Sequence, residues 1–539
     1  MSAAEAKSTQ TNVDDTVRVP IEKRIRIPTL DDRLTEELVI GLVGPVGSGC
    51  SITAKCLTKI LENEYSYSVD YYKLSDFIAE SAKLLGKAIQ GPSSGAHRVE
   101  QLQAVGDDLR KACGNAYLAA KAIGSIAKKR GDIGNGKADG SNNAEKKIRK
   151  AHIVDSIKHP DELKILRSTY GEIFWLIGVF APMEVRHDRL KYQSGFTNDE
   201  LNRIIQRDYR EEEAHGQNVR DVFYQADLFI RNDQPNEIRL EKTLSRFLEV
   251  IFGSPVHTPT QEESSMYAAY AEAAKSACLS RQIGAAIVSE GGELIGVGRN
   301  DVPRFGGGLY TEDADEGDNR CHAWRDKVCH NDKKKDALYR QIFDNFRKEG
   351  LLAGEVSLQR VVEALKVTGI KQLIEYSRAV HAEMDAIISV ARTQKSGLLG
   401  STLYSTTFPC HSCARHIVAS GIKKVLFIEP YPKSLATELH SDAVSEKEDN
   451  TGTKVAFLQF SGFAPKNILK LFNAGLTRKN SEGKLREFEK KRASPVVKVS
   501  LDDYSTHEKL VIAELDSNEK QASEGKQTDF LAPGVHSSS

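Results

Sequence analysis

Short apolar runs separated by amphipathic stretches dominate the first half of the chain. Four of these runs have the length of buried strands, and they lie at 38–43, 152–155, 173–180 and 227–230. Strands that alternate with helical segments favour a parallel sheet covered by helices on both faces. We therefore predict an α/β domain over 36–255, preceded by a flexible N-terminal segment over 1–35.

A second α/β pattern follows the glycine and proline residues at 253–259, which mark a linker. Helical periodicity begins at Ser264, and apolar runs at 283–288 and 293–298 predict a hairpin. Later elements are expected at 402–408, 424–429 and 455–460 as strands and at 466–475 as a closing helix. The pattern predicts a three-layer α/β/α domain over 262–475 and a polar C-terminal extension over 476–539.

Two short motifs in this second part combine metal ligands with one carboxylate. A His-Ala-Glu tripeptide begins at His381, and a Pro-Cys-His-Ser-Cys stretch ends at Cys413. Zinc prefers nitrogen and thiolate ligands in a tetrahedron, and a catalytic site leaves one of the four positions to water. His381, Cys410 and Cys413 are the predicted zinc ligands, and Glu383 projects in another direction and suits a proton shuttle. Zinc-dependent nucleobase deaminases use this spacing.

The alternative interpretation of these motifs is a structural zinc, or a buried cysteine pair without metal. A structural site normally has a fourth protein ligand. His411 and His416 are the neighbouring candidates, but each is expected on the surface of the helix that starts at the cysteines.

A glycine-rich turn over 44–51 follows the first predicted strand and opens an amphipathic run. Such turns let backbone N–H groups converge on phosphate oxygens at a helix N-terminus. The phosphate-binding motif G-x-x-x-x-G-K-[ST] has a lysine where this chain has Cys50, so the usual charge on the β- and γ-phosphates is missing. The predicted contacts are Gly44, Gly47, Gly49 and Ser51, with ATP or GTP and magnesium as candidate ligands.

Residues 36–255 resemble P-loop nucleotide and nucleoside-monophosphate kinases, and the stretches 154–160 and 226–232 carry that resemblance. Asp155 ends a predicted strand, at the position from which such proteins reach magnesium. Because the lysine is absent, three interpretations stay open: phosphotransfer, nucleotide binding without chemistry, and a structural or regulatory scaffold. The polar stretch 131–150 is expected to be a surface loop.

Charge and cysteine content narrow the class of protein. The 539 residues contain 75 Lys and Arg and 75 Asp and Glu, which is unlike the basic balance of a protein whose main partner is a nucleic acid. The sequence has no apolar run long enough to span a membrane and no signal-peptide core at its start. Eight cysteines in such a chain favour reduced thiols and metal ligands, so a cytoplasmic protein is expected.

Four motifs in order, at 277–285, 298–301, 381–383 and 409–413, resemble those of the deoxycytidylate deaminase family. The resemblance implies that Asn300 contacts the sugar and helps to frame the base; an Asn that closes a turn after a strand is the alternative. Some members carry a second, structural zinc, for which Cys278, Cys321, Cys329 and His322 or His330 would be the ligands, or else 302–369 is a charged loop with incidental cysteines. Candidate phosphate contacts are Arg281, Arg378 and Lys433.

A P-loop kinase-like domain ahead of such a deaminase domain resembles the bacterial anti-phage deaminases called anti-viral cytidine deaminases. The resemblance implies a hydrolase that converts dCTP and dCMP to dUTP and dUMP with release of ammonia, and thereby depletes dCTP during phage replication. It also implies a homo-oligomer, free deoxycytidine nucleotides as substrates, and restraint by a small RNA.

Three alternatives remain from the sequence. One is a deaminase that edits cytidine or adenosine within RNA or single-stranded DNA, which would need a basic, aromatic-lined channel. Another is a housekeeping dCMP deaminase of pyrimidine metabolism. The last is a nucleotide sensor without activity, and the intact set of His381, Glu383, Cys410 and Cys413 disfavours it.

Overall fold

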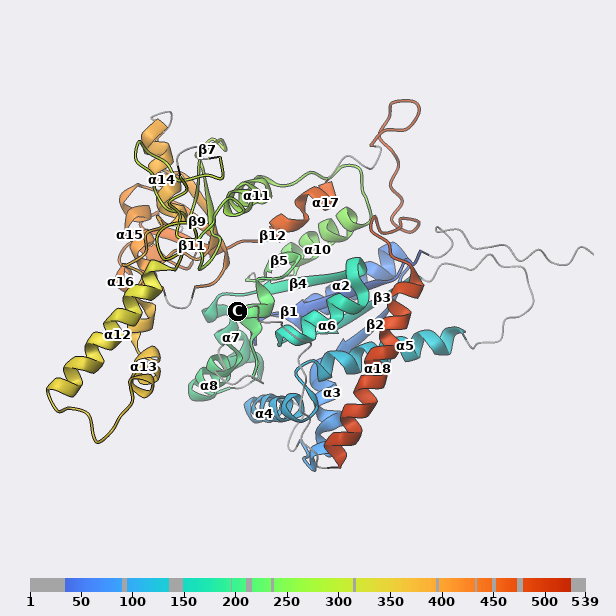
Figure 1. Cartoon of the computed structure of the whole chain (residues 1–539). Helices are drawn as coiled ribbons and strands as arrows, with labels where there is room; N and C mark the ends of the chain where they lie inside the picture. Colours follow the sequence, from blue (N-terminus) through green and yellow to red (C-terminus); the bar gives the residue numbers. More distant parts are fainter. Residues whose placement is uncertain are drawn as a thin grey trace, which may run out of the picture.

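The computed structural model contains two six-stranded sheets with helices on both sides of each (Figure 1). It describes residues 34–89, 95–134, 149–194, 196–209, 216–233, 237–313, 317–393, 397–431, 434–447, 452–472 and 478–524. The expected flexible segment and most of the expected loop at 131–150 lie outside these ranges. The two sheets with their helices confirm the predicted fold class, which is α/β in both halves of the chain.

The first sheet has the strand order β12-β5-β4-β1-β3-β2, and all neighbours are parallel except β12 and β5. Its strands are β1 (Leu38–Val43), β2 (Ser68–Lys73), β3 (Lys150–Asp155), β4 (Phe174–Phe180), β5 (Leu228–Arg231) and β12 (Gly462–Phe463). The helices of this half are α2 (Cys50–Tyr65), α3 (Leu74–Ser81), α4 (Ala96–Cys113), α5 (Tyr117–Gly134), α6 (Pro160–Tyr170), α7 (Met183–Ser194), α8 (Asn198–Tyr209), α9 (Val219–Phe223) and α10 (Ile238–Ile251), with 3-10 turns η1 (Ala82–Leu85) and η2 (Gly171–Ile173).

Strand β1 shows how the sequence builds this sheet. Leu38, Ile40 and Leu42 join the apolar core that α2 and α10 cover, whereas Val39 and Val43 join the core under α5 and α6. Successive side chains of a strand point to opposite faces, so an unbroken apolar run is what a strand buried on both faces requires.

The second sheet has the order β10-β11-β9-β8-β6-β7, with antiparallel pairing only at β8-β6 and β6-β7. Its strands are β6 (Gly284–Val288), β7 (Leu294–Arg299), β8 (Thr402–Thr407), β9 (Lys424–Glu429), β10 (Val444–Ser445) and β11 (Val455–Gln459). The nearby helices are α11 (Gln261–Ala273), α14 (Ala382–Thr393), α15 (His411–Ala419) and α16 (Ala436–Leu439).

Helices α14 and α15 share one apolar core with one face of this sheet, and α11 packs on the other face. The layers approach closely at two glycines. A Cβ atom at Gly298 would lie 2.2 Å from the backbone nitrogen of Ala386 in α14, and one at Gly284 would lie 1.9 Å from the carbonyl oxygen of Ala269 in α11. Glycine at these positions therefore allows the helix backbones to rest on the strands, which fixes the height of α14 above the sheet.

The chain returns to the first sheet after β11. Phe463 of β12 pairs with Leu228 of β5, and α17 (Ile468–Phe472), preceded by the turn η4 (Pro465–Asn467), joins the core under α10. Residues 462–472, which the expected division assigns to the second domain, thus lie on the first sheet. We propose a boundary near 460 instead.

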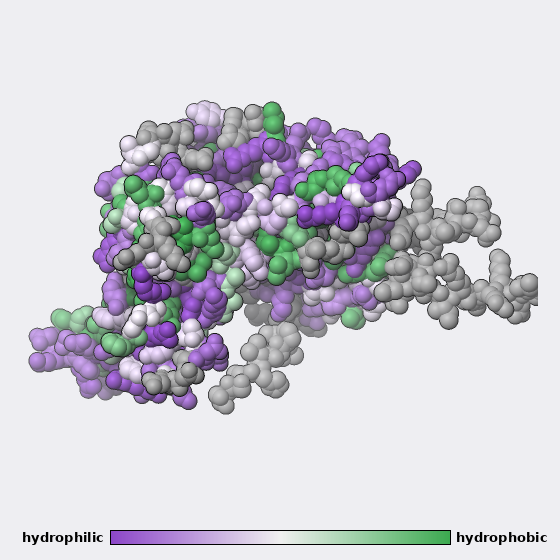
Figure 2. All heavy atoms as spheres, turned by 90° about the horizontal axis from the view of Figure 1, so that it is seen from above, coloured by the Kyte–Doolittle hydropathy of each residue, from purple (hydrophilic) through white to green (hydrophobic). Residues whose placement is uncertain are grey.

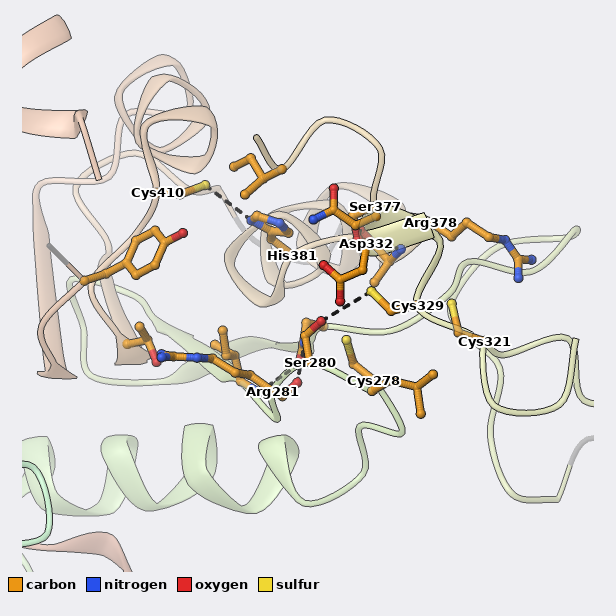
Figure 3. A pocket seen from close by; sticks show the side chains of 18 of the residues that line it. Cys278, Ser280, Arg281, Cys321, Cys329, Asp332, Ser377, Arg378, His381 and Cys410 are labelled. Carbon is orange, nitrogen blue, oxygen red and sulfur yellow. Dashed lines mark hydrogen bonds between the residues drawn. The ribbon is translucent and has the colours of Figure 1, made fainter. Parts of the chain in front are cut away.

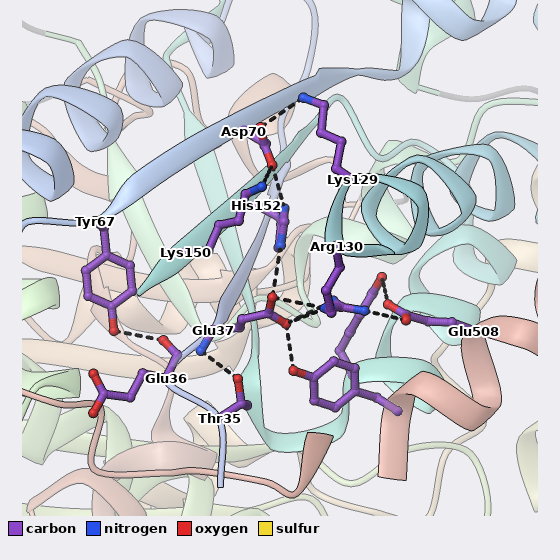
Figure 4. Close-up of polar contacts among 12 residues, drawn as sticks. Thr35, Glu36, Glu37, Tyr67, Asp70, Lys129, Arg130, Lys150, His152 and Glu508 are labelled. Carbon is purple, nitrogen blue, oxygen red and sulfur yellow. Dashed lines mark hydrogen bonds and ion pairs between the residues drawn. The ribbon is translucent and has the colours of Figure 1, made fainter. Parts of the chain in front are cut away.

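The C-terminal extension contains α18 (Leu501–Ser523), which packs along α5 (Figure 1). A buried polar network connects α18 to α5 and to the residues before β1 (Figure 4). Arg130 of α5 contacts Glu508 of α18 at 2.5 Å and Glu37 before β1 at 2.9 Å, while Tyr504 donates to Glu37 at 2.6 Å. The extension is therefore an integral part of the first domain's packing.

The insertion at 302–369, for which a charged loop was one of the two interpretations, contains two helices, α12 (His330–Lys348) and α13 (Leu358–Lys366), followed by the turn η3 (Gly369–Gln372). These helices project from the body of the molecule (Figure 1), and Tyr339 and Val361 are their buried residues. Hydrophilic residues make up most of the surface seen in Figure 2, with small hydrophobic patches between them. None of the helices that the structure describes is both long and apolar enough to cross a bilayer.

Candidate active site

The N-terminal ends of α14 and α15 meet at one point and bring the two predicted motifs together. His381 directly precedes α14, and Glu383 lies in its first turn. Cys410 is the N-cap of α15, where its sulfur accepts a hydrogen bond from the backbone N–H of Cys413 at 3.4 Å. Thiolates at a helix N-terminus are favoured by the helix dipole and by the free N–H groups of the first turn.

Nδ1 of His381 lies 3.3 Å from Sγ of Cys410 and 3.4 Å from Sγ of Cys413. In a tetrahedral site with Zn–N of about 2.0–2.1 Å and Zn–S of about 2.3 Å, nitrogen and sulfur ligands stand about 3.5 Å apart. The geometry therefore fits zinc. Among the described residues, the cluster consists of these three ligands, which leaves the fourth position of a tetrahedron to water.

The carboxylate of Glu383 lies beside the cluster and is buried. Its Oε1 accepts a hydrogen bond from Ser405 of β8 at 3.2 Å, and its Oε2 lies 3.4 Å from Sγ of Cys413. Burial raises the pKa of Glu383, and the negative charge of Cys410 adds to this effect. A raised pKa brings a carboxyl group closer to the pH at which the protein works, and this favours general acid–base catalysis.

The three candidate ligands also perturb one another. The hydrogen bond from Cys413 lowers the pKa of Cys410 to about 4, with a further contribution from His381. The hydrogen bond to Cys410 raises the pKa of His381 to about 8, and the same contact together with burial raises the pKa of Cys413. The lowered pKa of Cys410 favours its thiolate, which is the form that binds a metal.

A cavity of about 370 Å³ opens in front of His381 and Glu383 (Figure 3). Its size suits a nucleotide-sized ligand. Four basic side chains contribute to its walls, namely Arg220, Arg281, Lys335 and Arg378. Such a lining favours an anionic ligand.

Asn300, the predicted substrate contact, lies in this cavity wall and is buried. Its Oδ1 accepts from the backbone N–H of Ile283 at 2.7 Å, and its Nδ2 donates to the carbonyl oxygen of Arg281 at 2.7 Å. The side chain therefore holds the loop before β6 in place. Contact with the sugar stays a prediction.

The candidate phosphate contacts differ in their surroundings. Arg281 pairs with Glu429 at 2.7 Å, and the guanidinium of Arg378 stacks 3.7 Å from the ring centre of Trp324. Lys433 lies outside the described residues.

Two residues near the site were not suggested by the sequence. Ser405 holds Glu383, and a serine inside a strand carries no signal of that role. Arg220 comes from α9 of the first domain and pairs with Asp221 at 3.1 Å, yet it lines the same cavity as His381. The first domain thus supplies part of the wall of this cavity.

The cysteines of the insertion gather on one side of the cavity (Figure 3). Sγ of Cys329 lies 3.6 Å from Oγ of Ser280, next to Cys278. Among the described residues, Cys278, Cys321 and Cys329 do not bring three ligand atoms within 4.8 Å of one another. The second zinc stays a prediction.

The glycine-rich turn lies in the first domain between β1 and α2 and lines a separate cavity of about 340 Å³. Gly47 and Gly49 have φ angles of +82° and +97°, a region that favours glycine. Oγ of Ser51 donates to Asp155 at 2.8 Å, so the hydroxyl and the carboxylate that would hold magnesium in a P-loop protein lie together. Gly44 and Cys50 line the same cavity.

The fold and the site are those of the nucleobase deaminase class. Residues 259–429 match the family model described as "Cytidine and deoxycytidylate deaminase zinc-binding region". The deoxycytidylate deaminase of Enterobacteria phage T4 is 31% identical over 166 residues, which are 31% of this chain and 76% of that protein. The chain therefore belongs to the deoxycytidylate deaminase family.

Other similar proteins match a smaller part of this chain or have a lower sequence identity. The human deoxycytidylate deaminase is 29% identical over 96 residues, 17% of this chain and 46% of that protein. The dCMP deaminase of cyanophage S-TIM5, solved with dCMP and dUMP, aligns with 38% of this chain and all of its own at 17% identity and a TM-score of 0.21. Shikimate kinase of Aquifex aeolicus aligns with 39% of this chain and 97% of its own at 15% identity and a TM-score of 0.22.

Proposed function

We propose that the protein is a zinc-dependent hydrolase that deaminates dCMP and dCTP to dUMP and dUTP. The observation that carries the proposal is the three-ligand cluster of His381, Cys410 and Cys413 with a buried carboxylate, Glu383, beside it. Zinc held by these ligands would supply a water of lowered pKa, near 7, as the nucleophile.

The chain's own residues account for the proton movements. Glu383 takes a proton from the water as its oxygen bonds to C4 of the cytosine ring, and it delivers that proton to N3. Glu383 next takes the proton of the new hydroxyl on C4 and passes it to the exocyclic amine. The C4–N bond then breaks with its electron pair on nitrogen, the carbonyl of the uracil ring forms at C4, and ammonia leaves. The hydrogen bond from Ser405 holds Glu383 in position for these transfers.

The basic lining supports a phosphorylated substrate. Arg220 and Arg281 approach the cavity from two domains, and each guanidinium offers donors that match phosphate oxygens. We propose Asn300 as a contact to the sugar, next to the loop that it orders.

We further propose that the first domain binds a nucleotide without transferring its phosphate. Gly44, Gly47, Gly49 and Ser51 would hold ATP or GTP with magnesium, and Cys50 in place of lysine disfavours phosphotransfer. In this proposal the domain regulates deamination. The resemblance to the anti-viral cytidine deaminases adds three further points to the proposal. The protein depletes dCTP in anti-phage defence, forms a homo-oligomer and is restrained by a small RNA.

The test is release of ammonia from dCMP, dCTP, CTP and a cytosine-containing oligonucleotide by zinc-loaded protein. Conversion of dCMP and dCTP supports the proposal. Conversion of dCMP alone would indicate a housekeeping dCMP deaminase, and conversion of the oligonucleotide alone would indicate an editing enzyme.

A further inference from the structure

The insertion between β7 and α14 supplies part of the wall of the cavity in front of His381. The first two turns of α12 contribute His330, Asn331, Asp332 and Lys335 to this wall. Two contacts fix the start of the helix there. Nδ2 of Asn331 donates to the carbonyl oxygen of Leu373 at 3.3 Å, and the sulfur of Cys329 lies 3.6 Å from the hydroxyl of Ser280. The remainder of α12 projects from the body of the molecule (Figure 1).

Three consecutive lysines near the start of α12 differ in their surroundings. Lys333 is exposed and pairs with Asp326, and Lys334 is exposed. Lys335 is half-buried and is the one of the three that lines the cavity. Asp332 stands three residues before Lys335, and residues at this spacing are neighbours on one side of a helix. The helix thus presents a carboxylate and an ammonium group together to the cavity (Figure 3).

This pair of charges lies nearer to solvent than the candidate zinc site. Glu383 and Cys410 are buried, whereas Asp332 is exposed. The cytosine ring must reach the buried end of the cavity in order to react, so the phosphates of a nucleotide extend toward the mouth. A triphosphate extends further out than a monophosphate.

The chemistry of the pair matches a triphosphate that carries magnesium. The carboxylate of Asp332 repels a phosphate without a metal ion, but magnesium binds to one or two carboxylates together with the phosphates of a substrate. The ammonium group of Lys335 forms charge-assisted hydrogen bonds with phosphate oxygens. A carboxylate and a lysine side by side therefore suit both components of a magnesium–nucleoside triphosphate.

We propose that α12 recognises the magnesium-bound triphosphate of dCTP, with Lys335 on the β- or γ-phosphate and Asp332 on the magnesium ion. The inference rests on the proposed deamination of dCMP and dCTP, and it adds the residues that distinguish the longer substrate. The insertion is then a specificity element of the deaminase.

Steady-state kinetics with both nucleotides tests the lysine. Lys335→Ala should raise the KM for dCTP about tenfold, leave the KM for dCMP within about twofold, and leave kcat unaltered, because one contact to the outer phosphates is lost. Lys334→Ala, at the exposed neighbour outside the cavity wall, is the matched control. Equal changes for dCTP and dCMP, or no change for dCTP, would overturn the assignment of Lys335.

The dependence on added magnesium tests the aspartate. Magnesium should lower the KM of the wild-type protein for dCTP and not for dCMP. Asp332→Asn should lose this effect, and without magnesium it should bind dCTP at least as tightly as wild type, because a negative charge beside the phosphates is removed. Asp336→Asn, at an exposed position one turn further along α12, should keep the effect of magnesium.

A purely structural role of Asp332 gives a different result. Asp332 lies in the first turn of α12, where the helix dipole favours a carboxylate. If that were its role, Asp332→Asn would lower the unfolding temperature and retain the magnesium effect on dCTP, which would overturn the magnesium contact.

Failure of this inference can be told apart from failure of the proposed deamination. A wild-type protein that converts dCMP but not dCTP would leave the deaminase standing and overturn the role of α12. A protein that converts neither would overturn the deaminase. Equilibrium dialysis of magnesium–dCTP with Glu383→Ala, with and without Lys335→Ala, measures the contact in the absence of turnover, and equal affinities would overturn it.

Discussion

Ser405 of β8 donates a hydrogen bond of 3.2 Å to Glu383 of α14, and so a strand of the sheet fixes the carboxylate beside the candidate zinc ligands. The relationship gives a single glutamate on a helix end one fixed position, as the proposed proton shuttle requires. It also separates the role of Glu383 from that of the ligands, which makes the site testable residue by residue.

Replacing Glu383 by alanine should leave zinc bound and lower the turnover of dCMP by a factor of about 1,000 or more. The variant loses general acid–base catalysis, and it also loses the group that aligns the attacking water. Metal content and ammonia release measure the two effects. Glu293→Ala, on an exposed turn, is the control and should behave as wild type. Turnover retained by Glu383→Ala would remove Glu383 from the mechanism.

Replacing Cys410 by alanine should abolish both zinc binding and turnover, because two protein ligands hold the metal weakly. Elemental analysis of purified protein gives the number of zinc ions per chain. One ion is expected from the described cluster, and a second that disappears in Cys329→Ala would establish the predicted structural zinc. Full zinc content in Cys410→Ala would contradict the assignment of this ligand.

Replacing Arg220 by alanine should raise the KM for dCMP about tenfold, the size expected for loss of one charge-assisted contact of about 1.4 kcal/mol. The KM for deoxycytidine, which has no phosphate, should not change. Arg239→Ala, on an exposed stretch of α10, is the matched control. Equal effects on both substrates would show that Arg220 acts through the packing of the two domains rather than on phosphate.

Replacing Cys50 by lysine should tighten the binding of ATP or GTP to the first domain, since it restores a positive charge at the turn. Deamination should change only through regulation by that nucleotide, not in its dependence on Glu383. Equilibrium dialysis and the dCMP assay measure the two properties. Unchanged nucleotide binding and regulation would count against a phosphate site at this turn.

The buried network of Figure 4 predicts how stability depends on pH. Burial acts to raise the pKa of Glu37, but the imidazole of His152, 3.8 Å away, and the charge and hydrogen bonds of Arg130 lower it to about 2 from 4.5. A lowered pKa stabilises the fold above about pH 4.5, and that contribution is lost as the pH falls toward 2. At about 1.4 kcal/mol per pKa unit it amounts to about 3 kcal/mol at most.

Unfolding by urea at a series of pH values measures this contribution. Glu37→Gln should lower the free energy of unfolding at neutral pH and flatten its decline below pH 4.5. Burial raises the pKa of Glu508, the other carboxylate on Arg130, so Glu508→Gln should keep that decline. An unaltered decline in Glu37→Gln would show that other carboxylates carry the acid sensitivity.

The sequence predicted the parts of the molecule that depend on local patterns. Strand β1 appears at the predicted residues because its apolar run is unbroken, and the motifs that begin at His381 and end at Cys413 meet because each lies at a helix start. These features need only short stretches of chain to be recognised.

Features that depend on distant contacts were not predictable. Phe463 lies in a two-residue strand with no periodicity, and it joins the first sheet only because Leu228 presents an open edge. Arg220 is a single residue whose place in the cavity wall follows from the packing of the two domains. The helices of the insertion were missed because their surfaces are almost entirely polar, which resembles a charged loop.

The most direct measurement is the mass change of dCMP incubated with purified, zinc-loaded protein, with Glu383→Ala alongside. The account predicts conversion to dUMP with one ammonia released per nucleotide by the wild-type protein and none by the variant. Zinc-loaded wild-type protein that leaves dCMP and dCTP unaltered, or a variant that converts them equally well, would contradict it.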